Sequence, residues 1–264
     1  MLELKNIYKT FNPGTINEKR ALNGLNLKLN EGDFVTVIGG NGAGKSTMLN
    51  AVAGTWLVDE GQILIDNIDV TKLSEHKRAA YLGRVFQDPM TGTAATMGIE
   101  ENLALAKRRG KSRLLRPGIT KAERTEYKEL LKILGLGLED RLTSKVGLLS
   151  GGQRQALTLL MATLQKPKLL LLDEHTAALD PKTASKVLEI TDMIVNRDHL
   201  TTLMITHNMK DAIAHGNRLI MMMEGKIILD IQGEAKKKLT VKDLLDQFEQ
   251  ASGKEFSNDS ALLG

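Results

Sequence analysis

The residues best suited to chemistry form a glycine-rich loop that ends in a lysine and two hydroxyl side chains. In FVTVIGGNGAGKSTMLNAV this loop lies between a strand-like and a helical segment, the context that a phosphate-binding loop requires. Glycines let backbone N–H groups converge on a phosphate, Lys45 adds positive charge, and the Ser46 hydroxyl can ligate Mg²⁺. The flanking elements disfavour a chance match. We predict a nucleoside triphosphate site formed by Gly39, Gly40, Asn41, Gly42, Ala43, Gly44, Lys45, Ser46 and Thr47.

Two adjacent carboxylates follow the apolar run in KLLLLDEHTAALD. Ligands gather at the carboxyl ends of strands in α/β sheets, so we expect this pair to lie beside the phosphate loop. Triphosphate hydrolysis needs one carboxylate to orient the metal and a base to polarise the attacking water. We assign the first role to Asp173 and the second to Glu174. A polar helix cap after a strand is the alternative, which the phosphate loop disfavours.

Two further polar residues end predicted strands at the same edge. Gln87 follows RVF and precedes Asp88-Pro89, so a turn residue is the simpler interpretation, although its amide could ligate Mg²⁺ or the lytic water. His207 ends TTLMITH, directly before a helix that Asn208 could cap. A single histidine is more often structural than catalytic. Beside a phosphate loop, however, this one would lie near a γ-phosphate.

A second glycine-rich turn lies later in the chain and carries no lysine. In VGLLSGGQRQALTLL, Ser150 and Gln153 have the spacing of a capping box at a helix start. That interpretation leaves Gly151 and Gly152 unexplained, because glycine in a first turn weakens a helix. Bare N–H groups at the positive end of a helix suit phosphate oxygens. The turn is therefore a second candidate anion site.

Together these motifs resemble one family, the nucleotide-binding subunits of ATP-binding cassette (ABC) transporters. The resemblance covers nearly the whole chain and keeps the family's order and spacing. Its motifs are the phosphate loop (39–47), Gln87, the signature LSGGQ (149–153), Asp173-Glu174, ALD (178–180) and His207.

The resemblance implies a role for each motif. Two cassettes would pair head to tail, and each signature would contact ATP held by the partner's phosphate loop, which explains the missing lysine. The residues acting across that interface would be Ser150, Gly151, Gly152, Gln153 and Asp180. Phe11 would stack on adenine, and Glu174 and His207 would be catalytic. Mg²⁺ would be held by Ser46, Gln87 and Asp173.

The sequence departs from the family pattern in three places. Gly40 and His175 each replace a common proline, and the helix after the signature lacks a frequent arginine. Neither proline replacement removes a ligand, but His175 could change how rigidly its loop is held. FQDPMTGTAATMGIEENLALA and LSGGQRQALTLLMATL resemble a bacterial importer subgroup paired with branched-chain-amino-acid-type permeases. For that subgroup an aromatic amino acid such as tryptophan is a suggested cargo.

The surrounding segments predict an α/β fold of the ABC-type P-loop NTPase class, with a mostly parallel sheet core, an antiparallel β edge and an inserted helical subdomain. Continuous apolar runs such as LLLLDE indicate strands buried on both faces, whereas ALNGLNLKLNEG alternates as a half-exposed antiparallel strand does. The predicted strands are 34–38, 63–65, 81–86, 169–172, 202–205 and 219–223.

Apolar residues at three- and four-residue spacing predict helices over 99–106, 121–134 and 151–164. We predict an ATPase domain over 1–235, consisting of a RecA-like core (1–87 and 163–235) and a helical subdomain (88–162). A C-terminal helix and tail follow over 236–264. That helix is expected over 240–250, with Thr240 as its cap.

Composition excludes several classes of protein. The apolar fraction of 42% and the charged fraction of 26% are typical of a soluble globular protein. No apolar run reaches the ~18 residues that a membrane span needs, and MLELKNIY lacks the layout of a secretory signal. The absence of cysteine excludes disulfides, thiolate zinc sites and cysteine nucleophiles. We expect a cytoplasmic protein, which the resemblance would place peripherally on the inner face of the cell membrane.

The basic residues are clustered, although the net charge is only +4. Such runs are usually solvated surface. Nucleic-acid sites generally add stacking aromatic residues, which both clusters lack, so we expect no nucleic-acid partner. Contact with anionic lipid headgroups is the less favoured alternative. The clusters are Lys107, Arg108, Arg109, Lys111, Arg113 and Arg116, and Lys236, Lys237 and Lys238.

The favoured function is the ATP-hydrolysing subunit of an importer, which binds two ATP molecules at a dimer interface. Its partners would be a second cassette, integral membrane permease subunits and an extracytoplasmic substrate-binding protein. An exporter or lipid-extracting complex is the alternative within transport. A soluble ABC ATPase of DNA repair or translation is disfavoured, because those members carry long insertions or two cassettes in one chain.

The segment QDPMTGTAATMGI links Gln87 to the helical subdomain. It is rich in small and apolar residues and has no charge after Asp88, which is unusual for a solvated loop but suitable for a groove that receives a short helix. We expect the membrane partner to dock here; an ordinary buried connection is the alternative.

Overall fold

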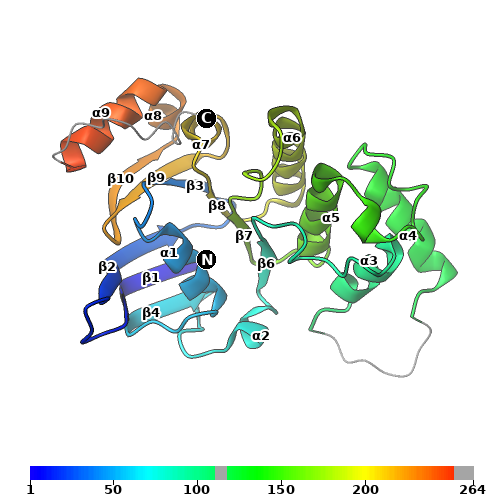
Figure 1. Ribbon diagram of the computed structural model, residues 1–264, viewed down its shortest axis with the longest axis horizontal. Coiled ribbons are helices and arrows are strands. Elements are labelled where there is room, and N and C mark those ends of the chain that lie inside the picture. The colour runs from blue at the N-terminus through cyan, green and yellow to red at the C-terminus, as the bar shows by residue number, and fades with distance from the viewer. Residues whose placement is uncertain (111–117, 253–264) are drawn as a thin grey trace.

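The chain folds around two β-sheets; helix α1 (Lys45–Ala53) packs in the core that they share, and the helices α3 to α6, within residues 99–198, lie on the other side of the larger sheet (Figure 1). The computed structural model describes residues 1–110 and 118–252. The larger sheet has the strand order β10-β9-β3-β8-β7-β6, and its neighbouring strands are parallel except for β10 and β9. The predicted mostly parallel core is therefore confirmed. Its strands are β3 (Phe34–Ile38), β6 (Leu82–Val85), β7 (Leu169–Asp173), β8 (Thr202–Ile205), β9 (Arg218–Met223) and β10 (Lys226–Gln232).

The first part of the chain forms a second, antiparallel sheet. Its order is β2 (Lys19–Leu29), β1 (Leu2–Phe11), β4 (Glu60–Ile65) and β5 (Ile68–Asp69). The sequence predicted antiparallel strands here, but as an edge of the parallel sheet rather than a sheet of their own. They separate because Leu25, Leu27 and Leu29 enter a core that they share with β3 and α1 (Lys45–Ala53).

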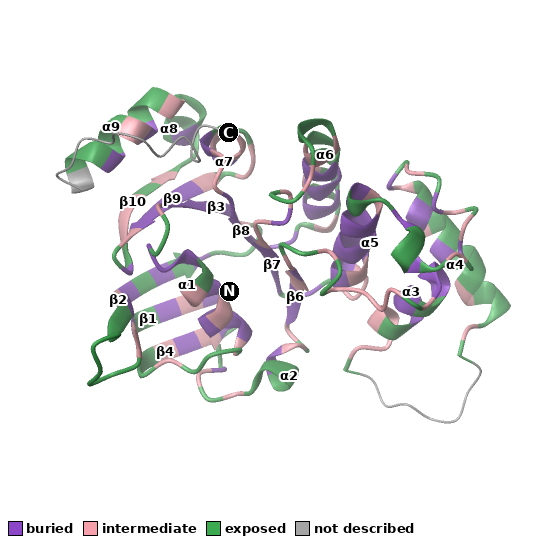
Figure 2. Ribbon diagram, in the orientation of Figure 1, coloured by how far each residue is buried: buried purple, intermediate pink, exposed green. Residues whose placement is uncertain are grey.

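The central strands are buried on both faces, as their continuous apolar runs predicted. Leu169 and Leu171 of β7 enter the core between the two sheets, whereas Leu170 and Leu172 enter a second core beneath the helices. This alternation follows from the two-residue period of a strand. Figure 2 shows β3 and β8 as buried along their length, and β7 is buried up to its last residue, Asp173, which is half-buried. The carboxyl ends of these strands are therefore held by packing on both sides.

The predicted helical segment is confirmed by α3 (Ile99–Lys107), α4 (Lys121–Lys132) and α5 (Gly151–Thr163). A short 3₁₀ turn, Val146–Leu148, precedes α5. Helix α5 also reaches the larger sheet, because the Gln155 amide donates to the Phe86 carbonyl at 3.0 Å, just after β6. Helix α6 (Pro181–Asp198) contributes Ile190 and Ile194 to the same core. The division into core and subdomain stays a prediction.

Helices α7 (Met209–Ala214), α8 (Glu234–Lys237) and α9 (Val241–Ser252) lie at the end of the molecule opposite α3 and α4 (Figure 1). A short helix, α2 (Glu75–Arg78), precedes β6. Thr240 caps α9 as predicted: its hydroxyl accepts a hydrogen bond from the Asp243 backbone N–H at 3.2 Å. The predicted tail over 253–264 lies outside the described residues. Within the described part of the chain, the helices are too short or too polar to cross a bilayer.

The described residues of the two basic clusters are solvated only in part: Lys237 and Lys238 are exposed, as predicted, whereas Lys236 is buried and residues 107–109 are half-buried. Lys107 pairs with Glu126, Arg108 pairs with Glu123 at 3.0 Å, and the Arg109 guanidinium reaches the Ala162 carbonyl at 3.5 Å. Lys236 is 2% exposed, and its ammonium donates to the His215 and Gly216 carbonyls. Because these side chains already have partners within the chain, their charge is less available to a lipid or nucleic-acid surface. Lys111, Arg113 and Arg116 lie outside the described residues.

Candidate nucleotide site

A cavity of about 250 Å³ lies at the carboxyl edge of the larger sheet. Strands β3, β7 and β8 run parallel, so the residues that follow them emerge at this one edge. The cavity brings together most of the residues predicted to touch nucleotide. Its walls are Phe11, Lys19, Ala21, Asn41, Gly42, Ala43, Gly44, Lys45, Ser46, Thr47, Glu174 and His207.

The phosphate loop depends on glycine for its path. Gly39 (φ 148°) and Gly44 (φ 100°) both have positive φ. A Cβ on Gly39 would stand 2.2 Å from the Met222 carbonyl oxygen, and one on Gly44 would stand 2.5 Å from that of Ala21. No other residue fits there, because such contacts are shorter than any real Cβ makes. The loop therefore keeps its curve, with backbone facing the cavity.

Lys45 folds back across this loop. Its Nζ donates to the Gly39 carbonyl at 2.6 Å and to the Gly40 carbonyl at 3.2 Å, and the residue is 5% exposed. Burial lowers the pKa of its ammonium, while the charges of Glu174 and Asp173 oppose that shift. Two carbonyl acceptors and two carboxylates nearby favour the charged form, which suits the binding of a polyanion.

Glu174 and His207 meet inside the cavity. The His207 Nε2 lies 2.6 Å from the Glu174 Oε1, and the Glu174 backbone has a positive φ of 47°. The hydrogen bond with His207 lowers the pKa of the Glu174 carboxyl, although burial opposes it. The carboxylate is therefore unprotonated at neutral pH and available to accept a proton. Asn208 caps α7 next to His207, as predicted.

Asp173 and Gln87 do not line this cavity. Burial raises the pKa of the Asp173 carboxyl, although Arg84 opposes that shift by an ion pair at 3.3 Å. Gln87 is exposed beyond the end of β6. The predicted Mg²⁺ ligands thus lie on three elements, at the start of α1, at the end of β7 and after β6, and of the three only Ser46 is in the wall of the cavity.

This set of donors fits Mg²⁺ held mainly by phosphates and water. Mg²⁺ prefers oxygen ligands and usually takes only one or two from the protein. Ser46, Asp173 and Gln87 offer a hydroxyl, a carboxylate and an amide oxygen. Among the described residues, no group of three His, Asp or Glu side chains converges on a purely protein-bound metal site.

Lys19 and Ala21 were not predicted. Phe11 and Lys19 are directly opposite each other in the antiparallel pairing of β1 and β2. The Lys19 Nζ lies 3.0 Å from the position that a Cβ on Gly42 would take. This register of β1 against β2 contains several irregularities, which the pattern of the sequence does not reveal. Lys19 therefore adds a second positive charge beside the loop.

Comparison with known proteins agrees with this geometry. A family model described as "ABC transporter" matches residues 22–177. The chain belongs to the ABC transporter family. The cassette is 45% identical over 252 residues to a tyrosine transport ATP-binding protein of Clostridioides difficile, covering 95% of this chain and all of that protein. It is 34% identical to the methionine import ATP-binding protein MetN of Bartonella henselae, covering 86% of this chain and 64% of MetN.

Solved structures of ABC cassettes have the same fold. A dimeric post-hydrolysis state of MJ0796 bound to ADP and Pi matches with a TM-score of 0.74 at 32% identity, covering 88% of this chain and 98% of that one. The ADP conformation of MJ1267 matches with a TM-score of 0.77 at 27% identity, covering 96% and 99%. The chain is thus an ABC-type P-loop ATPase that hydrolyses ATP for transport, and ABC ATPases generally use Mg²⁺ with ATP.

The signature turn of the cassette does not line the cavity at the carboxyl edge of the larger sheet. Ser150 and Gln153 form the predicted capping box, with reciprocal hydrogen bonds of 3.3 and 3.2 Å. Gly152 has a packing explanation that the sequence did not supply: a Cβ there would stand 2.0 Å from the Thr183 Cγ2 of α6. Ser150 and Gly151 remain exposed at the helix start, and Asp180 caps α6 through the Thr183 N–H at 3.1 Å.

His175 of the cassette is buried at 2% exposure. Its Nε2 lies 3.1 Å from the Thr191 hydroxyl of α6, and that hydroxyl donates to the Val187 carbonyl. Burial lowers the pKa of His175 to about 4, so the imidazole is neutral at physiological pH. The loop after β7 is therefore anchored to α6 by a side-chain contact where the family usually has a proline.

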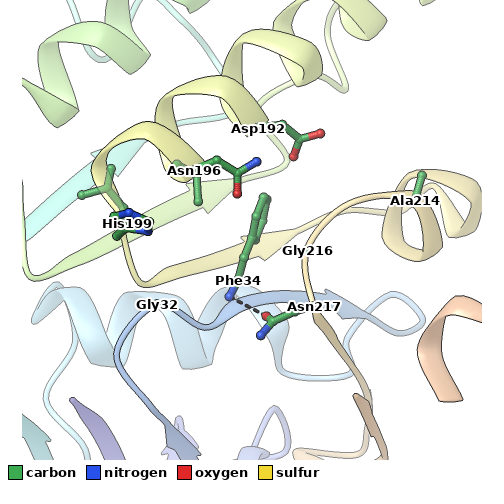
Figure 3. A pocket seen from close by; sticks show the side chains of 10 residues that line it. Gly32, Phe34, Asp192, Asn196, His199, Ala214, Gly216 and Asn217 are labelled. Carbon is green, nitrogen blue, oxygen red and sulfur yellow. Dashed lines mark hydrogen bonds between the residues drawn. The ribbon is translucent and has the colours of Figure 1, made fainter. Parts of the chain in front are cut away.

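A second cavity of about 330 Å³ lies near the other end of the parallel strands (Figure 3). Its walls include Asp192 and Asn196 from the last turns of α6, where the helix dipole is negative. The Asn217 Oδ1 already accepts a hydrogen bond from the Phe34 backbone N–H at 2.8 Å. A carboxylate and a negative helix end repel phosphate. The lining of this larger cavity therefore suits a nucleotide less well than the cavity beside the phosphate loop does.

Proposed function

We propose that this cassette powers uptake of an aromatic amino acid by hydrolysing two ATP molecules at a head-to-tail dimer interface. The observation that carries the catalytic part is the Glu174 carboxylate, held 2.6 Å from His207 in the wall that also contains Lys45 and Ser46. Glu174 polarises the attacking water and accepts its proton, and His207 orients that carboxylate and contacts the γ-phosphate.

The other residues of the site bind and position ATP. Backbone N–H groups of residues 39–47 and Lys45 hold the β- and γ-phosphates, and Phe11 stacks on adenine. Ser46, Asp173 and Gln87 would hold Mg²⁺ through their side-chain oxygens. When bound, the metal neutralises charge on the phosphates.

The signature turn is proposed to act on the partner's ATP. Ser150 and Gly151 are exposed at the positive end of α5, outside this chain's own cavity. Together with Gly152, Gln153 and Asp180, they would close over nucleotide bound to a second copy. That a dimer of MJ0796 has been solved supports this arrangement.

The permease is proposed to dock on the segment from Gln87 to Ile99, at the inner face of the membrane. Residues 92–95 and 97 are half-buried, and Met90 is 46% exposed. Asn102 fixes this segment by accepting the Ala94 N–H at 2.8 Å and donating to its carbonyl at 3.1 Å. Ala95→Glu should leave ATP affinity unchanged but abolish co-purification with the permease; retained co-purification would place docking elsewhere.

Uptake is proposed because the 45% identical relative is named for tyrosine transport, and the lower-identity relatives include import proteins for methionine and for spermidine and putrescine. The partners would be a permease of the branched-chain-amino-acid type and an extracytoplasmic binding protein. The test is ATP-driven transport in proteoliposomes carrying the whole complex. Labelled tyrosine or tryptophan should accumulate, and methionine should not. ATP-driven movement in the opposite direction would establish the exporter alternative instead.

A further inference from the structure

Phe11 has an aromatic neighbour that no motif identifies. The rings of Phe11 and Trp56 have centroids 4.9 Å apart and planes at 79°, an edge-to-face arrangement. This geometry is one that aromatic pairs prefer. Trp56 is the single tryptophan of the chain and is 38% exposed. A tryptophan this open to solvent contributes less to a core than a fully buried one, so its contact with Phe11 needs another explanation.

Hydrogen bonds fix the backbone on either side of this ring pair. Helix α1 begins at the phosphate loop and ends at Ala53, and its C-cap Gly54 has a φ of 85°. The Asn50 carbonyl accepts the N–H groups of Gly54 and Thr55 at 2.9 and 3.0 Å, and the Trp56 N–H lies within reach at 3.5 Å. Trp56 is therefore tied, through one short helix, to the loop that receives the phosphates.

A carboxylate fixes the end of β1 to the same turn. Asp59 accepts the Thr10 backbone N–H at 2.6 Å and the Lys9 ammonium at 2.7 Å. The Asp59 N–H donates in return to the Tyr8 carbonyl at 2.9 Å. The Lys9 Nζ lies 5.7 Å from the centroid of the Phe11 ring. The backbone before Phe11 is thus fixed, and Trp56 lies against the edge or face of its ring.

We propose that Trp56 is a positioning residue for the nucleobase, which orients Phe11 so that one ring face is presented to the purine. The inference rests on the proposed stacking of adenine on Phe11. A ring that is already oriented loses less conformational entropy when the base binds. Without that orientation, binding should be about two- to tenfold weaker, because the ring would have to be ordered when the base binds.

The test compares ligands with and without a base on the full chain. Trp56→Ala should weaken ATP binding about two- to tenfold, raise KM by a similar factor and leave kcat unchanged. Its affinity for inorganic triphosphate, which has no base, should equal that of the wild type. Trp56→Phe should restore most of the ATP affinity. The matched control is Leu57→Ala, because Leu57 is the next residue and is 51% exposed.

Two further variants separate this inference from the ATP site itself. Phe11→Ala should weaken ATP binding, and adding Trp56→Ala to it should cause no further loss, because Trp56 acts through Phe11. The positioning role is overturned if the Trp56→Ala variant binds ATP with wild-type affinity. It is also overturned if the substitution weakens the binding of inorganic triphosphate as much as that of ATP. Lys45→Ala tests the ATP site alone. It should weaken the binding of both ATP and inorganic triphosphate, and unchanged binding of the two would overturn the proposed ATP site.

Discussion

At the scale of the residue, Glu174 has an unusual environment for a carboxylate. It follows the buried strand β7 in a left-handed backbone conformation that non-glycine residues seldom adopt. Its backbone N–H donates to the Ile205 carbonyl at 3.1 Å, which ties it to β8. His207 then holds the carboxylate from the end of that neighbouring strand. Backbone strain and a specific partner at one residue are typical of a catalytic position.

Glu174→Gln should bind ATP with nearly wild-type affinity but hydrolyse it about 10²- to 10⁴-fold more slowly, the usual contribution of a general base. The amide keeps the shape of the side chain but cannot accept the proton. Phosphate release measures the rate of hydrolysis, and a separate binding measurement gives the affinity for ATP. Glu189→Gln on the exposed face of α6 is the control. Near-normal turnover would move the base elsewhere, with His207 the next candidate.

At the scale of the element, the signature helix α5 is fixed at its start by two separate devices. The capping box satisfies backbone donors of the first turn. The missing side chain at Gly152 lets α6 approach through Thr183. Gly151 is less constrained, because a Cβ there would meet only the end of the Leu179 side chain at 3.1 Å. Packing therefore accounts for Gly152, and the proposed contact with the partner's ATP accounts for Gly151.

Mixing two inactive variants should restore activity if the signature acts on the partner's ATP. A Lys45→Ala subunit keeps an intact signature, and a Ser150→Arg subunit keeps an intact phosphate loop. Random pairing gives one working site in half of the dimers, hence about a quarter of the wild-type ATPase rate.

Ser150→Thr, which keeps a capping hydroxyl, is the active control for the mixing experiment. A mixture as inactive as its two components would show that the turn does not act across a dimer.

At the scale of the whole molecule, the C-terminal helix reaches the phosphate loop. Phe248 of α9 is 8% exposed and packs in a third core with Ile38, Leu244 and Met221. A Cβ on Gly40 would lie 3.7 Å from its ring. Gly40, one of the two residues that replace a common proline, therefore lies beneath α9. Segments at opposite ends of the sequence meet at the nucleotide edge.

Phe248→Ala should lower the free energy of unfolding by about 2–4 kcal/mol, because it opens a cavity beneath α9. Denaturant unfolding with and without ATP measures the change. Gln247→Ala, on the exposed side of the same helix, should unfold as the wild type does. Equal midpoints for the two variants would mean that α9 contributes little to the folded state.

Local patterns predicted much of this molecule. The phosphate loop, the buried strands, the capping boxes at Ser150 and Thr240 and the cap at Asn208 depend on residues close in sequence. The separate sheet of β1, β2, β4 and β5, the position of Lys19 and the contact of Trp56 with Phe11 depend on strand register and long-range packing. Gly152 illustrates the difference: the sequence shows a glycine that weakens a helix, and only Thr183, on another helix, gives the reason.

The close approach of Gly152 to Thr183 also limits where this molecule can bend. Helices in contact through a missing side chain cannot slide or tilt apart without losing that packing. We therefore expect no hinge between α5 and α6. If α3 and α4 rotate, the bending would take place in the connections on either side of them. These two helices would then turn around α5. Distance probes on α5 and α6 should keep their spacing through the ATP cycle, whereas probes on α4 and α6 should not.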